Sequence, residues 1–168
     1  MAKFAGLGTI ARTFGIANYR NYTLGNFASQ LGMWVQRIAI GWLTWELTKD
    51  PKWLGIVAFA DFFPNVILAP LAGALADRLD RLKALRIYMA LSGTISAIIA
   101  WLTIADLITI HSLLVLVLIN GAVMSFGYPV RLSLIHALVG REALTSAVGV
   151  NALVFNIARI TGPALAGL

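Results

Sequence analysis

Three ionisable side chains, Arg37, Asp61 and Arg159, lie inside long apolar runs of the sequence. An arginine at the centre of a bilayer costs about 2.5–3.5 kcal/mol on insertion scales, so each arginine needs a partner or a water-filled cavity. One interpretation places all three groups on a substrate or proton pathway, with Asp61 as the group that is protonated. The alternative is a buried Arg–Asp pair that fixes helix packing, and the sequence favours neither.

The expected depths of the three groups fit both interpretations. With a rise of ~1.5 Å per helical residue, Arg37 lies ~20 Å from the inner boundary of its span, and the other two lie a few ångströms farther out. All three groups are therefore expected to reach the outer half of the membrane.

A second group of charges follows the second apolar run, in the stretch from Gly73 to Lys83. Gly73 is expected to let two helices approach closely, and a loop this short holds its two helices as a rigid hairpin. The charges of Asp77, Arg78, Arg81 and Lys83 are then available to pair with another helix end or another inner loop. The alternative is a plain anchor of positive charge at the inner membrane surface.

Other kinds of chemistry have little support. No serine–histidine–acid set converges on one side of the predicted membrane, so an enzyme is not expected. His111 and His136 are too far apart in topology to share a metal, and no metal or other cofactor is expected. The chain has no cysteine, which excludes disulfides and Cys-ligated zinc. No Gly-rich phosphate loop is present, so ATP-driven transport is not expected.

The elements that position these residues are membrane helices. The chain of 168 residues is 60% hydrophobic and only 12% charged, whereas a soluble domain is nearer half apolar and a quarter charged. The net charge of +6 comes from basic residues in short connections between apolar runs. A lipid bilayer is therefore the expected partner, and nucleic acid is not.

Five spans are predicted after a mixed cytoplasmic segment at residues 1–23. A bilayer core needs ~20 helical residues, while residues 47–52 form a turn and residues 131–142 are polar enough to leave the membrane. The asparagines inside spans are more often interhelical hydrogen bonds than ligands. On the fifth span, Asn151, Phe155, Arg159 and Gly162 fall on one face. The spans lie at about residues 24–46, 53–76, 85–106, 111–130 and 144–168.

The basic residues set the expected orientation. With the N-terminus inside, the outer loops hold only Lys49 and Lys52. Such a bias places the N-terminus in the cytoplasm and the C-terminus outside. The inner segments would hold nine basic residues: Lys3, Arg12, Arg20, Arg78, Arg81, Lys83, Arg86, Arg131 and Arg141.

The loop between the second and third spans has the pattern Gly-x-x-x-Asp-Arg-x-x-Arg, formed by Gly73, Asp77, Arg78 and Arg81. It resembles the signature loop of the major facilitator superfamily, although Leu82 stands where a second basic residue is usual. Further matching runs cover nearly the whole chain, at residues 18–22, 42–48 and 156–167. Together they resemble the branch of drug and siderophore exporters that includes enterobactin-exporter-like proteins.

The resemblance implies an all-α bundle, part of a six-span half, in which the first and fourth spans line a cavity between two rocking halves. Asp77 and Arg78 would belong to a cytoplasmic gate, and Gly162, Pro163 and Gly167 would face the interface between halves. The fourth span lacks an arginine that many proton-coupled exporters carry there, which leaves the coupling ion open. The candidates for the cavity or ion pathway are Gln30, Trp34, Arg37, Asp61, Asn65, Asn120 and Arg159.

With five spans and no second half, the sequence is expected to be the N-terminal part of a transporter. The expected function is efflux of small organic molecules across the inner membrane by an antiporter, once the missing half or a second subunit completes it. Apolar cavity walls with a few cations suit amphipathic or anionic molecules. The alternative is a truncated, non-transporting membrane protein that pairs with other helices.

Overall fold

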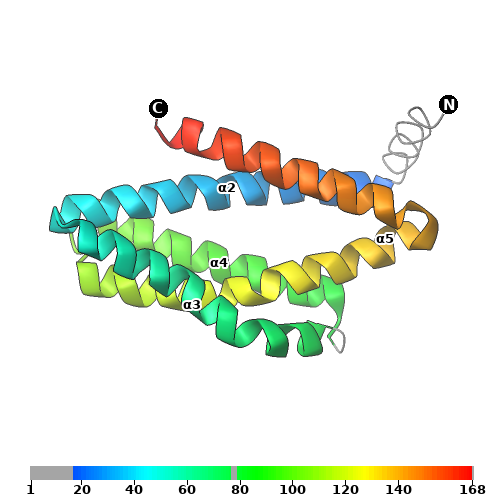
Figure 1. Cartoon of the computed structure of the whole chain (residues 1–168), viewed down its shortest axis with the longest axis horizontal. Helices are drawn as coiled ribbons and strands as arrows, with labels where there is room; N and C mark the ends of the chain where they lie inside the picture. Colours follow the sequence, from blue (N-terminus) through cyan, green and yellow to red (C-terminus); the bar gives the residue numbers. More distant parts are fainter. Residues whose placement is uncertain (1–16, 77–78, 168) are drawn as a thin grey trace. The chain divides into compact units, whose positions relative to one another are not determined.

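The computed structural model describes residues 17–76 and 79–167, and every regular element in these residues is an α-helix. By length and apolar composition, four segments among them can cross a membrane: Pro51–Leu75, Arg81–Ile104, Ile110–Gly140 and Leu144–Ala166. The fold is therefore a partial all-α membrane bundle, as the sequence predicts. The helices are α2 (Ala17–Thr48), α3 (Pro51–Ala76), α4 (Arg81–Ile104) and α5 (Ile110–Ala166) (Figure 1).

α2 is more polar than the other helices. Its 32 residues exceed the length that a bilayer core needs, but it is not among the four apolar segments. Thr23, Asn26 and Gln30 are each only 6% exposed, so these three polar side chains face the protein interior. A span at residues 24–46 therefore stays a prediction, and protein contacts are what would make such a span tolerable.

The helix ends carry the capping groups that short connections need. Asp50 accepts the Lys52 N–H at 2.9 Å, and Pro51 occupies the first position of α3, where its missing N–H costs no hydrogen bond. Asp106, two residues after the end of α4, lies in the left-handed region (φ 54°), which Asp adopts more readily than most residues. Thr109 and Ser112 then cap α5 reciprocally, each side-chain oxygen accepting the other's N–H. The connection between α2 and α3 is shorter than the predicted turn at residues 47–52, since only Lys49 and Asp50 lie between these two helices.

α5 consists of two helices joined at Gly140. The backbone of Gly140 has φ 67° and ψ −179°, a region that is essentially restricted to glycine. The first helix continues through residues 131–139, past the predicted end of the fourth span at residue 130. Side chains before and after the bend pack on the same aromatic residue, because Ile135, Val139 and Ala147 form one buried cluster with Tyr19.

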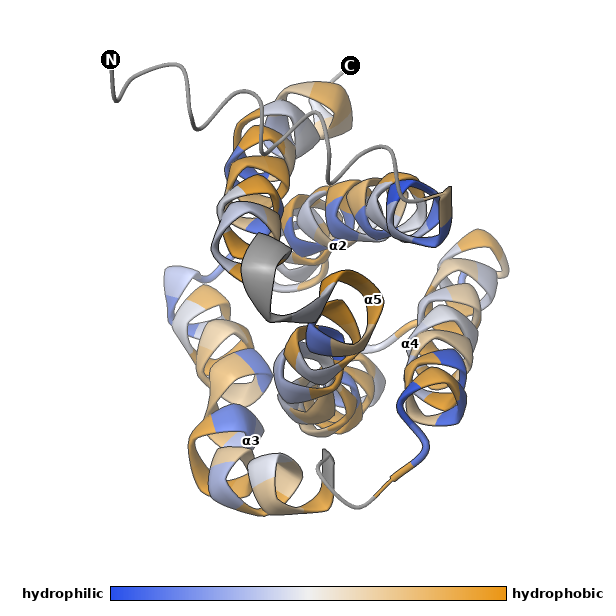
Figure 2. Cartoon of the chain, turned by 90° about the vertical axis from the view of Figure 1, so that its right-hand side faces the viewer, coloured by the Kyte–Doolittle hydropathy of each residue, from blue (hydrophilic) through white to orange (hydrophobic). Residues whose placement is uncertain are grey.

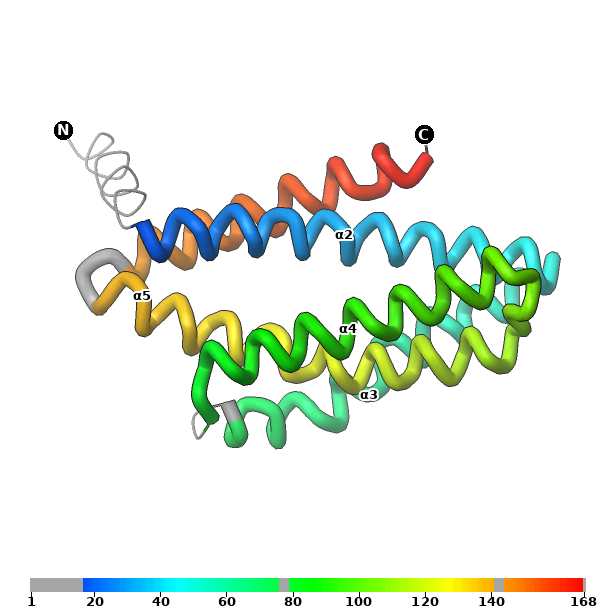
Figure 3. The backbone as a smooth tube through the Cα atoms, turned by 180° about the vertical axis from the view of Figure 1, so that it is seen from behind, coloured from blue at the N-terminus to red at the C-terminus, as the bar shows by residue number. Residues whose placement is uncertain are grey.

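The chain divides into two compact units, and α2 and α5 contribute to both. The first unit, Met1–Ile38 with Leu134–Leu168, contains the start of α2 and the second helix of α5. These helices run parallel, since Tyr19 contacts Ala147, Asn26 contacts Asn151 and Trp34 contacts Phe155. Figures 1 and 3 show the two helices side by side.

The second unit, Ala39–Ser133, contains the end of α2, all of α3 and α4, and the first helix of α5. α4 runs antiparallel to α5, because Tyr88 meets Met124 and Ser92 meets Asn120 (Figure 3). Hydrophobic residues make up most of α3 and α4, while the start of α4 is hydrophilic (Figure 2). The buried core consists of Val57, Ala60, Ile95, Ile99, Leu113 and Val117.

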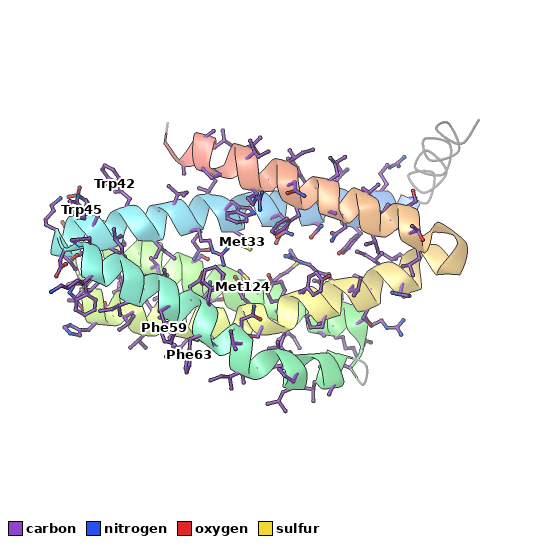
Figure 4. All side chains as sticks on the ribbon, viewed as in Figure 1. Met33, Trp42, Trp45, Phe59, Phe63 and Met124 are labelled. Carbon is purple, nitrogen blue, oxygen red and sulfur yellow. The ribbon has the colours of Figure 1, made fainter. Side chains whose placement is uncertain are left out.

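Tryptophans gather at one end of the second unit. Trp42 and Trp45 lie near the end of α2 (Figure 4), and Trp53 at the start of α3 packs edge-on against His111 at 5.8 Å. Trp101, near the end of α4, is 63% exposed. Because tryptophan is enriched where a membrane meets water, we expect this end of the unit to lie at a membrane surface.

Replacing Gly140 by alanine should lower the stability of the chain through its backbone alone. A Cβ at this position meets no atom within 4 Å, so the cost comes from the disallowed dihedral angles and amounts to about 1–3 kcal/mol. Thermal unfolding in detergent, followed by circular dichroism, should show a melting temperature several degrees lower.

Gly149→Ala is the matched control for this change. Gly149 lies within α5, and a Cβ added there also meets no atom within 4 Å, so alanine should be neutral or slightly stabilising. A Gly140→Ala protein that melts with the wild type would contradict the bend.

Candidate functional site

Polar side chains fill the contact between α2 and α5 in the first unit. The hydroxyl of Tyr19 donates to the carbonyl of Ala147 at 3.2 Å. About two helical turns farther along α2, Asn26 Nδ2 donates to Asn151 Oδ1 at 2.8 Å. Hydrogen bonds between side chains of neighbouring helices stabilise membrane bundles. The contact of Asn151 agrees with the interhelical interpretation of the asparagines.

Trp34 is held against α5 farther along this contact. A Cβ on Gly162 would lie 2.5 Å from the Cβ of Trp34, so only glycine permits the observed approach. The ring of Phe155 meets the indole edge-on, with 5.8 Å between centroids and 67° between planes. Such a geometry is favourable for aromatic pairs, and it leaves the indole with little freedom to turn.

Arg37 lies one turn after Trp34 on α2. Its Cζ is 5.2 Å from the centre of the Trp34 ring, within the range of a cation–π interaction. The indole Nε1 of Trp34 is buried and has no hydrogen-bond partner among the residues that the structure describes. Two hydrogen-bond donors, a guanidinium and an indole N–H, therefore belong to one neighbourhood of α2.

The other candidates of the first unit separate into buried and exposed groups. Gln30 is 6% exposed, on the face of α2 that packs inward. Arg159 is exposed, although the sequence places it on one face with Asn151, Phe155 and Gly162. A helical step of 100° separates Arg159 from the fully buried Ala158.

The predicted interface residues at the end of α5 also differ from one another. Gly162 is buried against Trp34 of α2, so in this chain it serves the contact between these two helices. Pro163 is half-buried and Gly167 is exposed. A role for these three residues between the halves of a transporter stays a prediction.

In the second unit, Asp61 and Asn120 lie where α3 and α5 come close. The carbonyl oxygen of Asp61 is 2.6 Å from the position that a Cβ on Gly121 would take. Asn120 is 5% exposed, and its Oδ1 accepts the Ser92 hydroxyl at 3.2 Å, which joins α4 to α5. Asn65 is exposed. The predicted meeting of Asp61 with Arg37 and Arg159 stays a prediction, because these groups belong to different units.

The predicted gate loop is described only in part, since Asp77 and Arg78 lie outside the described residues. Arg81 and Lys83 are exposed at the start of α4. Gly73 has open space around the position of a Cβ, so none of the described residues approaches it closely, and the helix contact expected there stays a prediction. The close approaches occur instead where glycine faces a neighbouring helix, at Gly121, Gly127 and Gly162.

Asp80 gives this loop a defined end. Its Oδ1 accepts the N–H groups of Lys83 and Leu82 at 3.0 and 3.1 Å, which caps α4. The hydrogen bond from Lys83 is the main reason that the pKa of Asp80 lies below its ordinary value, and the positive charges of Lys83 and Arg86 add to it. Asp80 is therefore ionised at neutral pH and favours the start of the helix.

A polar cluster on α4 and α5 is absent from the sequence-based candidates. Arg131 Nη2 donates to the Tyr88 hydroxyl at 3.2 Å, and that hydroxyl lies 3.2 Å from the Met124 sulfur. Gly127 leaves room for the Tyr88 ring, which a Cβ would approach to 2.8 Å. The sequence shows Gly127 one helical turn before Arg131, but this spacing does not identify Tyr88 as the partner, which lies 43 residues from Arg131 in the chain.

The geometry of the described residues does not indicate a metal site. Within residues 17–76 and 79–167, no group of three or more His, Cys, Asp or Glu side chains is placed to hold a metal ion.

Comparison with known proteins finds similarity to membrane transport proteins. The family described as transmembrane secretion effector matches residues 12–168. The staphyloferrin A transporter of Staphylococcus aureus (strain NCTC 8325 / PS 47) is 31% identical over 85% of this chain and 36% of its own length. The uncharacterized MFS-type transporter YfiS of Bacillus subtilis (strain 168) is 26% identical over 83% of this chain and 32% of its own length. No solved structure matches the chain significantly.

Replacing Gly162 by alanine should loosen the contact between α2 and α5. The added methyl would lie 2.5 Å from the Cβ of Trp34, so one helix must shift, at a cost of about 1–3 kcal/mol. Thermal unfolding should occur at lower temperature, and the tryptophan emission of the folded protein should change because Trp34 moves.

Gly32→Ala provides the comparison for this variant. Gly32 lies on α2 with no atom within 4 Å of a Cβ, so alanine there should leave both the melting temperature and the emission unchanged. If both variants behave like the wild type, the close contact is wrong.

Proposed function

The chain belongs to the transmembrane secretion effector family of the major facilitator superfamily, and we propose that it forms part of a secondary transporter that exports small organic molecules. The observation that carries the proposal is the family match over residues 12–168. The chain spans about a third of the length of the curated relatives that it matches. Transport is therefore proposed for the complete protein, to which this chain contributes a set of membrane helices.

The geometry of the first unit supports this role. α2 buries a series of polar side chains that includes Asn26 and Gln30. Polar residues in membrane helices face the bundle interior or a water-filled cavity. A helix with this composition suits the lining of a substrate pathway.

Export is the proposed direction, and an ion gradient is the proposed source of energy. The family description as a secretion effector and the resemblance to efflux proteins favour export. Asp61 is half-buried within α3 and is the proposed carrier of the coupling proton in an antiport cycle.

The proposed location is the inner cell membrane, with the N-terminus in the cytoplasm. The excess of basic residues in the predicted inner segments supports this orientation. Asp77, Arg78, Arg81 and Lys83 are proposed to form a cytoplasmic gate by contacting the remaining part of the transporter. That part is either further spans of the same polypeptide or a second subunit.

Transport by the full-length gene product tests the proposal. Efflux of a panel of small fluorescent organic molecules from cells should stop when a protonophore collapses the proton gradient. Asp77→Asn should reduce efflux by about tenfold or more, because a gate residue that loses its charge no longer pairs, while the amount of protein in the membrane stays the same.

Asp106→Asn is the matched control for Asp77→Asn. Asp106 is exposed in the connection between α4 and α5, and asparagine tolerates its left-handed backbone, so efflux should not change. A gene product that moves none of the panel in either direction, although inserted, would contradict transport. Equal loss in both variants would contradict the gate.

A further inference from the structure

We propose that Lys83 and Arg86, near the start of α4, bind the headgroup of an anionic phospholipid whose acyl chains lie along the exposed face of the same helix. The partner is a lipid rather than a transported substrate, so the site is independent of the proposed transport function and goes beyond it.

The first observation is that α4 buries one side and exposes the other. Its buried residues, Leu85, Tyr88, Ile95 and Ile99, recur at helical spacing on one side of the helix. Residues on the opposite side are exposed from residue 83 to residue 104, and after the two cations most of them are apolar. Lipid acyl chains are as apolar as leucine, so an uncovered face of this kind on a membrane helix suits them.

The second observation concerns the two ends of this exposed face. Lys83 and Trp101 are 18 residues apart, which is five helical turns, so both lie on the same side of α4. The rise between them is ~27 Å, close to the ~30 Å of a hydrocarbon core. Tryptophan is enriched at membrane surfaces, and a lysine near a helix end extends its ammonium toward the headgroups. The exposed face therefore spans the hydrocarbon core and has its cations at one headgroup layer.

The third observation is that these cations lack a full counter-charge. Asp80 interacts with Lys83 and Arg86 through charge, but its Oδ1 already accepts the backbone N–H groups of Leu82 and Lys83. Among the residues that the structure describes, neither basic side chain has a hydrogen bond or an ion pair. The segment from Asp80 to Arg86 holds three basic residues and one acid, so it attracts an anion from outside the chain.

The fourth observation is that the cations are unfavourable for the helix itself. The start of a helix is the positive end of its dipole, and α4 has no acidic residue in its first turn. Lys83 and Arg86 are three residues apart, so their like charges also repel. Asp80 already caps the helix, which leaves the two side chains to recognise a ligand. An anionic headgroup would relieve both repulsions, whereas a zwitterionic headgroup adds a positive charge of its own.

Arg81 lies outside this site. It precedes Lys83 by two residues, or 200° around the helix, and therefore falls on the side of α4 that carries the buried residues. Lys83 is also one of the proposed gate residues. Arg86 is not, so the decisive variant changes Arg86.

Lipid retention by the full-length gene product tests the site. The purified protein is incubated with equal amounts of palmitoyl-oleoyl phosphatidylglycerol (PG) and phosphatidylcholine (PC), which share their acyl chains, and native mass spectrometry counts the bound lipids. The wild type should retain PG in preference to PC. Arg86→Gln should lower the ratio of PG to PC by about fivefold, and Lys83→Gln in the same chain should lower it about fivefold again.

Three controls separate a lipid site from general attraction of anions. Arg86→Lys keeps the charge and should keep the preference. Arg20→Gln removes an exposed arginine from α2, on the same predicted side of the membrane, and should have no effect. Glycerophosphoglycerol, the PG headgroup without acyl chains, should not displace the lipid at millimolar concentration, because the apolar face contributes to binding.

Each alternative result has a definite meaning. A wild type without a PG preference would overturn the site and indicate that the remaining part of the transporter covers this face. Normal retention by Arg86→Gln, or an equal loss in Arg20→Gln, would also overturn it. Displacement by glycerophosphoglycerol would replace the lipid with a free anion. Should the double variant fail to fold by circular dichroism, Arg86→Gln alone decides.

The outcome is separable from that of the transport assay. Selective PG retention without any flux would contradict the proposed transport and leave the lipid site standing. Flux by a protein that shows no lipid preference would do the reverse.

Discussion

The contact between Gly162 and Trp34 is the constraint on which the first unit depends. A side chain at residue 162 would occupy the space of the Trp34 Cβ, 2.5 Å away. The absence of that side chain lets α5 approach α2 closely enough for Phe155 to meet the indole. The indole in turn supports the guanidinium of Arg37. In a membrane, where burial of apolar surface does not drive helices together, such close contacts between backbones are the main source of helix association.

The same principle organises the second unit with different residues. Gly121 lets α5 approach the backbone of α3 at Asp61, and Gly127 makes room for the Tyr88 ring on α4. Polar side chains then connect the helices across these contacts, as Ser92 does with Asn120. Each unit therefore combines glycine contacts with a few hydrogen bonds between helices. Many large apolar side chains lie on the outer surface instead, and Phe59 and Phe63 stack on each other there (Figure 4).

Much of the fold could be predicted from the sequence, because hydropathy and capping act locally. The apolar runs identify the four apolar segments, and Asp50 before Pro51 predicts the turn between α2 and α3. The contacts that build the site join residues far apart in the chain, and local patterns do not reveal them. A glycine in an apolar run shows that close approach is possible, but not whether a neighbour lies there. Among the described residues, Gly121 and Gly162 have such a neighbour and Gly73 has none. The bend at Gly140 escapes prediction for a related reason, since a glycine within a helical pattern does not reveal its backbone angles.

The account depends most directly on the parallel contact of α2 with the second helix of α5, and cross-linking in native membranes measures it. The chain has no cysteine of its own, so pairs can be introduced without a background reaction. Cysteines at residues 26 and 151, whose native side chains are hydrogen-bonded at 2.8 Å, should be joined efficiently by a short thiol reagent. Cysteines at residues 34 and 147 should not, because parallel helices separate them by ~15 Å along the axis. Cross-linking of the second pair and not the first would show that the helices run the other way, and the packing of Trp34 against α5 would then be wrong.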